Sequence, residues 1–320
     1  MSSADVATLS EEDVRSLVGP AEALAAMRTA FAALHRGAVT QPANMDYEFP
    51  EAQGEAHLKG AHIHGTPHWA VKAATGFWSN VPRGLPLTSG LFLVFSADTG
   101  FLSAILLDNG YLTELRTGAA GALAADLLAP AEVEQAAIIG AGGQARYQLE
   151  ALLGVRRPQR VVVASRSNAE TYADEMRALH DIDVTVTDVE TAVRTSQLVV
   201  TTTPSREPVV RAEWVQPGTH ITAMGSDFAE KQELETAVLA KADVVAADHP
   251  PVAAANGELH HALDDGSVPL DTVVPLGALV LGEATGRTSD DQITVCDLVG
   301  VGVQDAAIAG EVVARARLTV

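Results

Sequence analysis

The composition of the chain is that of a folded, acidic protein. It has 320 residues, 47% of them hydrophobic and 4% aromatic. This length and composition favour two domains, or one large α/β unit with an appendage, and exclude a mainly disordered chain. Lys and Arg number 21 against 41 Asp and Glu, so the net charge is −20 and nucleic-acid binding is disfavoured. The single cysteine, Cys296, excludes an internal disulfide framework and a cysteine-based zinc site.

The sequence carries no targeting or membrane signal. Residues 1–5 lack the basic and long apolar segments of a signal peptide, and no apolar run approaches the roughly 20 residues that span a bilayer. We therefore expect a cytoplasmic protein without a membrane partner.

The N-terminal part predicts helices followed by a β region. Residues from about 10 to 37 have helical spacing, and Ser10 followed by three acids is typical of a helix start. Between about 45 and 112, short strands separated by turn signals predict an antiparallel sheet, with strands at 68–72, 90–95 and 102–107. An Ala-rich helix is predicted over 113–128.

After Pro130 the pattern alternates between strand and helix. Apolar strands are predicted at 136–139, 160–164, 184–186, 198–201, 220–224 and 244–246, and again from about 293. Such alternation predicts an α/β fold with a parallel sheet covered by helices.

A glycine-rich turn follows the first of these strands. Gly140-Ala141-Gly142-Gly143-Gln144-Ala145 reads G-x-G-x-x-A between a strand and a helix, which is the context that a Rossmann-type dinucleotide site requires. Gly140 would permit the tight turn, Gly142 the approach of a pyrophosphate, and Ala145 close helix–strand packing, with the pyrophosphate on the helix N-terminus.

The tip of the second strand bears on the choice of cofactor. NAD sites usually place an acid there, but this strand ends in Ser165-Arg166-Ser167. Arg166 between two hydroxyls suits a 2′-phosphate and favours NADPH, although the same arginine could stack on the adenine of NADH.

Several blocks of sequence together resemble the ornithine cyclodeaminase/μ-crystallin family. They are Trp69–Gly76, Gly84-Leu85-Pro86, Asp98-Thr99-Gly100, Leu112–Ala120, the glycine turn, Thr201–Pro204, Gly225-Ser226-Asp227 and Asp297–Asp305. Within the family, 107–113, 223–227 and 257–261 are most similar to ectoine-utilisation cyclodeaminase-like proteins and iminosuccinate reductases.

The resemblance implies a domain organisation. Residues 121–302 would form a Rossmann-type, doubly wound dinucleotide-binding domain. Residues 1–120 and 303–320 would form a discontinuous α+β domain for substrate binding and dimerisation, so that the protein is a homodimer.

The resemblance also implies roles for three charged residues. Lys72 in its strand could be a solvated lysine on a sheet edge, and Arg116 could be an ordinary ion-pair partner near a helix start. Asp227 at a strand-to-helix turn could be a simple N-cap. The resemblance implies that Arg116 holds the substrate carboxylate and that Lys72 contacts this carboxylate or takes part in proton transfer. Asp227 would be the acid/base group near the substrate nitrogen.

Further residues are expected to contact the cofactor from the same motifs. Besides Gly140, Gly142, Ala145, Ser165, Arg166 and Ser167, they are Thr117, Gly143, Gln144, Thr202, Thr203, Pro204, Met224, Gly225 and Gly302.

The chain also departs from the family pattern. Many members carry an arginine shortly after a proline such as Pro42, but here the sequence reads Ala43-Asn44-Met45. Candidate replacements are His57, Lys59, His62, His64 and Arg83. No metal site is predicted, because the pair His260-His261 has no accompanying ligand set and is expected on a helix surface.

Three functions remain open from the sequence. The first is an NAD(P)H-dependent imine reductase that reduces a small α-imino acid such as iminosuccinate and runs reversibly as an amino-acid dehydrogenase. The second is a cyclodeaminase of ornithine type, which releases ammonia without net redox change. The third is a non-catalytic NADP(H)-dependent small-molecule binding protein.

Overall fold

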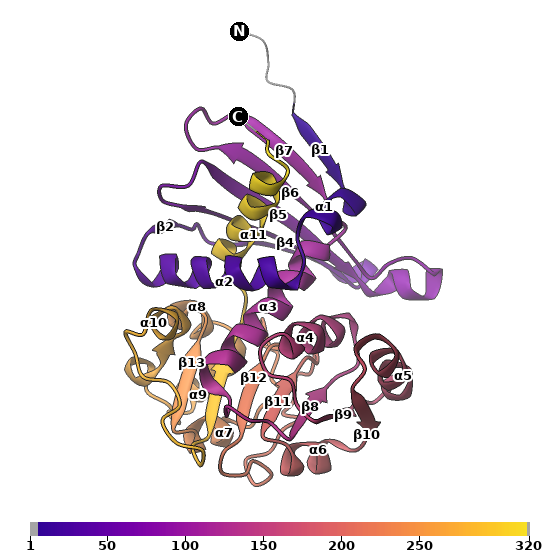
Figure 1. Ribbon diagram of the computed structural model, residues 1–320, viewed down its shortest axis with the longest axis vertical. Helices are drawn as coiled ribbons and strands as arrows, with labels where there is room; N and C mark the ends of the chain where they lie inside the picture. Colours follow the sequence, from indigo (N-terminus) through magenta and orange to yellow (C-terminus); the bar gives the residue numbers. More distant parts are fainter. Residues whose placement is uncertain (1–5, 319–320) are drawn as a thin grey trace. The chain divides into compact units, whose positions relative to one another are not determined.

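The computed structural model describes residues 6–318, which form two compact units (Figure 1). Unit 1 combines the chain up to Arg116 with the segment from Val301 onward, and unit 2 runs from Thr117 to Gly300. Helix α3 (Tyr111–Leu128) begins in unit 1 and ends in unit 2.

Unit 1 is built on a mostly antiparallel sheet of seven strands. The strand order is β1-β7-β6-β5-β4-β2, with β3 also paired to β4, and only the β1–β7 pair is parallel. The elements are β1 (Ala7–Ser10), α1 (Glu11–Leu17), α2 (Pro20–His35), β2 (Val39–Thr40), β3 (Met45–Phe49), η1 (Pro50–Ala52), β4 (Gly54–Ile63), β5 (His68–Phe77), η2 (Trp78–Arg83), β6 (Thr88–Ser96), β7 (Leu102–Leu107) and α11 (Gly302–Arg315). The antiparallel region predicted for 45–112 is confirmed by β3 to β7.

The last helix of the chain returns to unit 1. Helix α11 lies against α2, β4 and β5 (Figure 1). Its first residue, Gly302, packs so closely on β4 that a Cβ there would lie 2.7 Å from the carbonyl oxygen of Gly60. The contact requires glycine and brings the buried residues of α11 onto the central strands.

Unit 2 is a doubly wound α/β domain, as predicted. Eight parallel strands have the order β10-β9-β8-β11-β12-β15-β13-β14. The strand order reverses between β8 and β11, because β9 and β10 lie on one side of β8 and the later strands lie on the other. The elements are β8 (Gln135–Ile139), α4 (Gly143–Leu153), β9 (Arg160–Ala164), α5 (Ala169–His180), β10 (Asp183–Val186), α6 (Val189–Thr195), β11 (Leu198–Thr201), β12 (His220–Ala223), α7 (Thr236–Lys241), β13 (Val244–Ala247), α8 (Pro250–Ala253), α9 (Gly257–Asp264), η3 (Leu270–Thr272), β14 (Val274–Pro275), α10 (Leu276–Leu281) and β15 (Thr294–Asp297).

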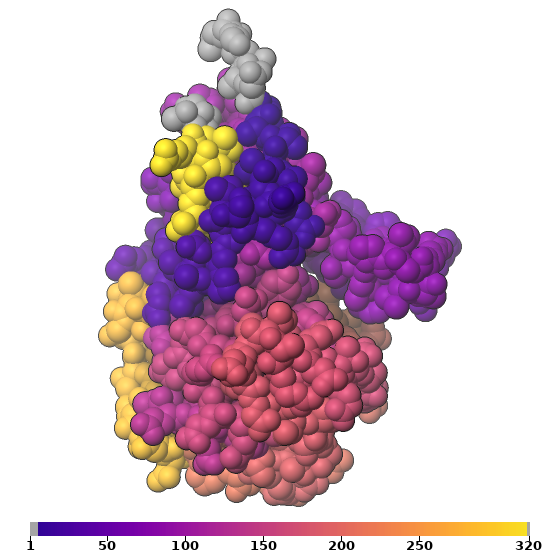
Figure 2. All heavy atoms as spheres, turned by 45° about the vertical axis from the view of Figure 1, so that its right-hand side comes forward, coloured from indigo at the N-terminus to yellow at the C-terminus, as the bar shows by residue number. Residues whose placement is uncertain are grey.

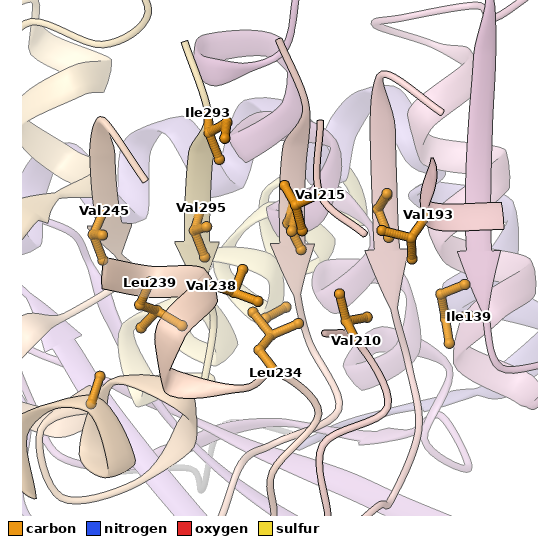
Figure 3. Packing of buried hydrophobic residues seen from close by; sticks show 14 of the residues in the cluster. Ile139, Val193, Val210, Val215, Leu234, Val238, Leu239, Val245, Ile293 and Val295 are labelled. Carbon is orange, nitrogen blue, oxygen red and sulfur yellow. The ribbon is translucent and has the colours of Figure 1, made fainter. Parts of the chain in front are cut away.

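Along the strands of unit 2, successive side chains alternate between two hydrophobic cores. Ile139 and Val295 face one core with residues of α6, α7 and α9 (Figure 3), whereas Ile138 and Val163 face the other with residues of α4 and α5. This period of two, with apolar residues on both sides, is typical of a strand buried between two helical layers.

Among the described residues, no single helix combines the length and apolarity needed to cross a bilayer. Helices α1 and α2 reach that length and composition only when taken together, and they are bent by 79°.

Candidate functional site

Unit 2 contains a cleft at the carboxyl ends of β8, β9 and β11. Its volume is about 470 Å³, and its walls come from the segments that follow these three strands. In open α/β sheets, ligands bind where the strand order reverses, and here that point lies between β8 and β11. The cleft is lined by Ile139, Gly140, Ala141, Gly142, Ala164, Ser165, Arg166, Ser167, Asn168, Val189, Thr202, Thr203, Pro204, Ser205, Glu207, Pro208 and Val209.

The glycine turn has the geometry of a phosphate cradle. Gly140 has a φ of +111°, and a Cβ there would lie 2.5 Å from Thr202 Oγ1, so only glycine fits. Gly142 is the N-cap of α4, and neither Gly142 nor Gly143 has another atom within 4 Å of its Cβ position. The start of an 11-residue helix therefore faces open space, as binding of a dinucleotide pyrophosphate requires.

The tip of β9 carries the residues that would meet the adenosine end of such a ligand. Ser165, Arg166, Ser167 and Asn168 all line the cleft, and Arg166 is exposed. None of these four residues is acidic, so the carboxylate that usually binds a ribose 2′-hydroxyl is not supplied by this segment.

The predicted cofactor residues fall into three groups. Gly140, Gly142, Ser165, Arg166, Ser167, Thr202, Thr203 and Pro204 line the cleft. Gly143, Gln144 and Ala145 form the first turn of α4, while Met224 and Gly225 directly follow β12. The sequence analysis missed Asn168, Val189 and the 205–209 segment, which has no motif to mark it.

Gly302 has a packing role in the structure, and its contact with the cofactor stays a prediction. It belongs to unit 1 and is buried against Gly60, and it is not among the residues that line the cleft. A glycine at a helix start can serve a phosphate or a close helix–strand contact, and the sequence did not distinguish them.

Thr117 is tied to helix α4 through Gln148. The side-chain amide of Gln148 donates to the Thr117 carbonyl and to Gln144 Oε1, both at 3.0 Å. A Cβ at Gly118 would lie 2.6 Å from the Tyr147 carbonyl oxygen, so α3 and α4 pack in close contact. The Ala-rich helix predicted over 113–128 is confirmed as α3, and Gln148 was not predicted as a residue of this contact.

Unit 1 contains a buried cluster of charged side chains that joins β5, α3 and α11. Lys72 Nζ lies 3.1 Å from Asp305 Oδ2, and Arg116 Nε lies 3.2 Å from Asp305 Oδ1. Arg116 Nη1 also donates to Gln304 Oε1 at 3.2 Å. Lys72, Arg116 and Asp305 are 2%, 5% and 0% exposed, so neither cation is a solvated surface residue.

The position of Lys72 excludes its interpretation as a solvated lysine on a sheet edge. Strand β5 lies between β4 and β6, so Lys72 is in the middle of the sheet and not at its edge. Lys59 of β4 pairs directly with it in the strand register.

Burial and neighbouring charges set the protonation of this cluster. The pKa of Lys72 is lowered to about 7, mainly by burial and also by the charges of Arg116 and Lys59, while Asp305 opposes the shift. Burial alone would raise the pKa of Asp305, but Lys72 and Arg116 together lower it. The cluster therefore holds a stable carboxylate, a permanent guanidinium and an amine that can gain or lose a proton near neutral pH.

Asp108 is a second buried acid near Lys72. It precedes α3, and its Oδ2 accepts a hydrogen bond from the backbone N–H of Leu112 at 2.8 Å. Burial raises its pKa, while backbone donors and Lys72 oppose the shift. The motif Asp108-Asn109-Gly110 thus shapes the entry into the helix that carries Arg116.

Lys59 is the best placed of the candidates for the missing family arginine. His57 contacts Asp46 and Glu55, and His64 contacts Thr40, so both are engaged on the strands of unit 1. His62 lies 3.3 Å from the Thr66 carbonyl, and Arg83 is exposed in η2. Lys59 alone among them contributes to the field at Lys72 as a cation on the neighbouring strand.

Asp227 lies in unit 2, in the turn after β12. Its carboxylate is 40% exposed and forms an ion pair with Lys231 at 2.7 Å. It therefore does not serve as the N-cap of a regular helix, since the next helix, α7, begins at Thr236. Its position beyond the carboxyl end of a parallel strand is the one expected for a ligand-facing group.

The two adjacent histidines are less exposed than expected. His260 Nδ1 lies 3.3 Å from the Ala254 carbonyl, His261 Nε2 lies 2.8 Å from the Lys231 carbonyl, and both side chains are partly buried. Among residues 6–318, no group of three or more His, Cys, Asp or Glu side chains has the arrangement to hold a metal ion.

Comparison with known proteins decides the family. The model of the ornithine cyclodeaminase/mu-crystallin family matches residues 4–319. The chain belongs to this family. The resemblance noted from the sequence blocks is confirmed over nearly the whole length.

Relatives within the ornithine cyclodeaminase/mu-crystallin family include proteins of several named activities. An uncharacterized cyclodeaminase of Sinorhizobium fredii, y4tK, is 41% identical over 94% of this chain and 93% of its own. The alanine dehydrogenase of Archaeoglobus fulgidus is 36% identical over 94% and 92%, and the iminosuccinate reductase of Paracoccus denitrificans is 32% identical over 97% and 96%.

Solved structures of family members have the same fold. An archaeal alanine dehydrogenase dimer with bound NAD has a TM-score of 0.90 at 35% identity, covering 98% of this chain and 96% of that one. The iminosuccinate reductase of Paracoccus denitrificans in complex with NAD⁺ has a TM-score of 0.90 at 29% identity, with the same coverage.

Proposed function

We propose that the chain is an NAD(P)H-dependent reductase that converts a small α-imino acid to the amino acid and runs reversibly as an amino-acid dehydrogenase. The observation that carries the proposal is the buried cluster of Lys72, Arg116 and Asp305. It places two cationic side chains on one carboxylate, all at most 5% exposed.

The charge balance of this cluster suits a carboxylate ligand. With Lys72 protonated, one positive charge is left over, and a buried charge is costly unless it is paired. Arg116 donates through Nε and Nη1, and its Nη2 has no hydrogen-bond partner in the described part of the chain. A substrate carboxylate would take up the remaining donors of Arg116 and Lys72 and balance the charge.

The proton chemistry is assigned to two groups. Burial leaves the pKa of Lys72 at about 7, so this amine can hold the carboxylate in one state and move a proton in the other. We assign Asp227, which forms an ion pair with Lys231, to the proton at the substrate nitrogen. The nicotinamide dinucleotide, when bound, supplies the hydride.

The residues of unit 2 fit that cofactor. The open space at Gly142 and Gly143 and the cleft of about 470 Å³ accommodate a dinucleotide. The relatives with bound NAD support the same assignment. Gly140, Gly142, Thr202, Thr203 and Pro204 would hold its phosphates and nicotinamide half, and Ser165 to Ser167 its adenosine half.

For the cofactor's identity, we propose a preference for NADPH based on Arg166. An exposed guanidinium between two serine hydroxyls offers a 2′-phosphate several charge-assisted hydrogen bonds. Changing Arg166→Ala should then raise KM for NADPH at least about tenfold more than KM for NADH. Equal effects on both would show that Arg166 stacks on the adenine and that the preference is wrong.

We also propose a homodimer formed through unit 1. Within the described part of the chain, strand β3 pairs only with β4, and all five of its residues are exposed, including Met45, Tyr47 and Phe49. Trp78 and Val81 of the neighbouring η2 are 41% and 59% exposed, and this part of unit 1 stands out as a lobe in Figure 2. An apolar edge strand of this kind is a liability that pairing with a second copy removes.

The substrate is to be found by a reductive-amination screen. Glyoxylate, pyruvate, oxaloacetate and cyclic imines are paired with ammonia or methylamine, each with NADH and NADPH, and absorbance at 340 nm is followed. A reductase consumes the reduced cofactor with one of these pairs. Ammonia release from ornithine without net absorbance change would instead identify a cyclodeaminase, and inactivity with all pairs would favour a binding protein.

A further inference from the structure

Unit 2 contains a buried acid, Glu233, that none of the proposed steps uses. Glu233 is 0% exposed, and its carboxylate accepts three hydrogen bonds. They come from Thr201 Oγ1 at 2.6 Å, from the Thr203 backbone N–H at 2.5 Å and from the Gly225 backbone N–H at 2.8 Å. No Lys or Arg of the described residues forms an ion pair with it.

These three donors belong to the segments that follow two neighbouring strands. Thr201 is the last residue of β11, and Thr203 lines the cleft two residues later. Gly225 follows β12, which ends at Ala223 and pairs with β11. One carboxylate therefore ties together two strand ends at the edge of the sheet where the cleft lies.

The packing around the carboxylate leaves no room for another arrangement. A Cβ at Gly225 would lie 2.2 Å from the Thr203 carbonyl oxygen and 2.7 Å from Glu233 Cδ. Gly225 is thus glycine because Thr203 and Glu233 occupy the space of a side chain. The two loops therefore lie in direct contact beside the carboxylate.

A second buried acid holds Glu233 in place. Glu258, 1% exposed, accepts the backbone N–H of Glu233 at 2.7 Å and that of Leu234 at 3.0 Å. The segment around Glu233 has no regular secondary structure, so these bonds replace those that a helix or strand would provide. The bonds to Glu258 therefore fix the backbone at Glu233 and Leu234, and the three bonds to its carboxylate fix the side chain of Glu233.

We propose that Glu233 is a positioning residue for cofactor binding, which presets the loops at Thr203 and Gly225 in the form that receives the nicotinamide dinucleotide. The inference rests on the proposed dinucleotide site. The carboxylate acts through these loops and takes no part in the reaction.

The chemistry of the site explains why the residue is an acid. All of the backbone groups that face the two oxygens are N–H donors, so the site requires a group that only accepts hydrogen bonds. A glutamine has the same shape, but in either orientation its NH2 would face the N–H of Thr203 or of Gly225. One donor would then be left unsatisfied in a buried place, which displaces one of the loops.

The test compares Glu233→Gln with the wild type in direct binding of NADH and NADPH, followed by cofactor fluorescence without substrate. We expect Kd to rise at least about tenfold for both cofactors, and kcat at saturating cofactor to stay within about threefold. Thr294→Val is the matched control, because Thr294 is a buried residue hydrogen-bonded to His220 at the opposite edge of the sheet. It should lower Tm and leave Kd unchanged.

The possible outcomes separate the two proposals. Equal binding by Glu233→Gln and the wild type would overturn the positioning role, whereas a wild type that binds neither dinucleotide would overturn the proposed function itself. If Glu233→Gln does not fold, Thr201→Val removes one of the three hydrogen bonds and should raise Kd about threefold for both cofactors. An unchanged Kd in Thr201→Val would then refute the inference.

Discussion

Replacing Asp305 by asparagine tests the charge cluster of unit 1 most directly. Among residues 6–318, Asp305 is the only group that pairs with both Lys72 and Arg116, and it is fully buried. Asp305→Asn keeps the shape of the side chain and removes its charge. The two cations then lose the carboxylate that compensates their burial.

The expected cost follows from the chemistry of the two cations. Removing one partner of a buried ion pair costs about 3–5 kcal/mol of unfolding free energy. Lys72 can relieve part of this cost by losing its proton, because its pKa is already about 7 and Asp305 is the group that raises it. Arg116 cannot do so. We therefore expect a loss near the lower limit, about 3 kcal/mol at pH 7.5.

Urea unfolding followed by tryptophan fluorescence measures this loss. Trp69 and Trp78 belong to unit 1 and Trp214 to unit 2, so a Trp214→Phe background reports on the unit that contains Asp305. Glu311→Gln is the control. It removes an exposed ion pair with Arg315, and the loss of such a pair should leave the urea midpoint unchanged.

A double-mutant cycle with Lys72→Met isolates the pair. Once Lys72 is apolar, the loss caused by Asp305→Asn should shrink, giving a coupling energy of at least about 1.5 kcal/mol. A loss below about 1 kcal/mol for Asp305→Asn, with coupling near zero, would refute the view that this carboxylate is the counter-ion of the cluster.

Three further predictions follow from the same structure. Arg116→Ala should lower kcat/KM at least about a hundredfold, and near-normal kinetics in a folded variant would remove Arg116 from the site. Burial lowers the pKa of Lys72 from 10.5 to about 7, so between these pH values the unfolded state binds more protons than the folded state. The free energy of unfolding of the wild type should therefore rise relative to that of Lys72→Met as pH increases from about 7 to about 10. Parallel curves of unfolding free energy against pH for the two proteins would contradict the pKa shift. Sedimentation should show a dimer that Tyr47→Asp in β3 weakens, and a wild-type monomer at micromolar concentration would contradict the proposed interface.

The parts of the fold that were predictable are those with strong local patterns. Strands 160–164 and 198–201 were predicted to the residue because continuous apolar runs mark strands buried on both faces. Strands β1, β2 and β14 were not predicted, since each has two to four residues and no periodicity of its own. Pairing with a partner, such as the parallel register of β1 with β7, creates them.

The residues of the candidate site were likewise predictable only where the sequence pattern is local. The glycine turn was readable because its residues are contiguous and the flanking strand and helix can be recognised. Asp305 was part of a quoted motif but received no role, because it meets Arg116 across 189 positions of sequence. Glu233 also received no role from the sequence. The three groups that donate hydrogen bonds to it are backbone and hydroxyl groups of other segments, so no local pattern marks it.

The charges of the cluster would also allow this acidic chain to bind the anionic substrate that we propose. The chain carries −20, so its distant field repels anions, but that field is screened over about 10 Å at moderate salt. Lys72 and Arg116 act at contact distance inside a dry environment, where the attraction of a cation for a carboxylate is several times stronger than in water. Their burial costs stability that Asp305 only partly restores. The substrate carboxylate would complete that compensation, so the same imbalance that weakens the free fold would contribute to binding.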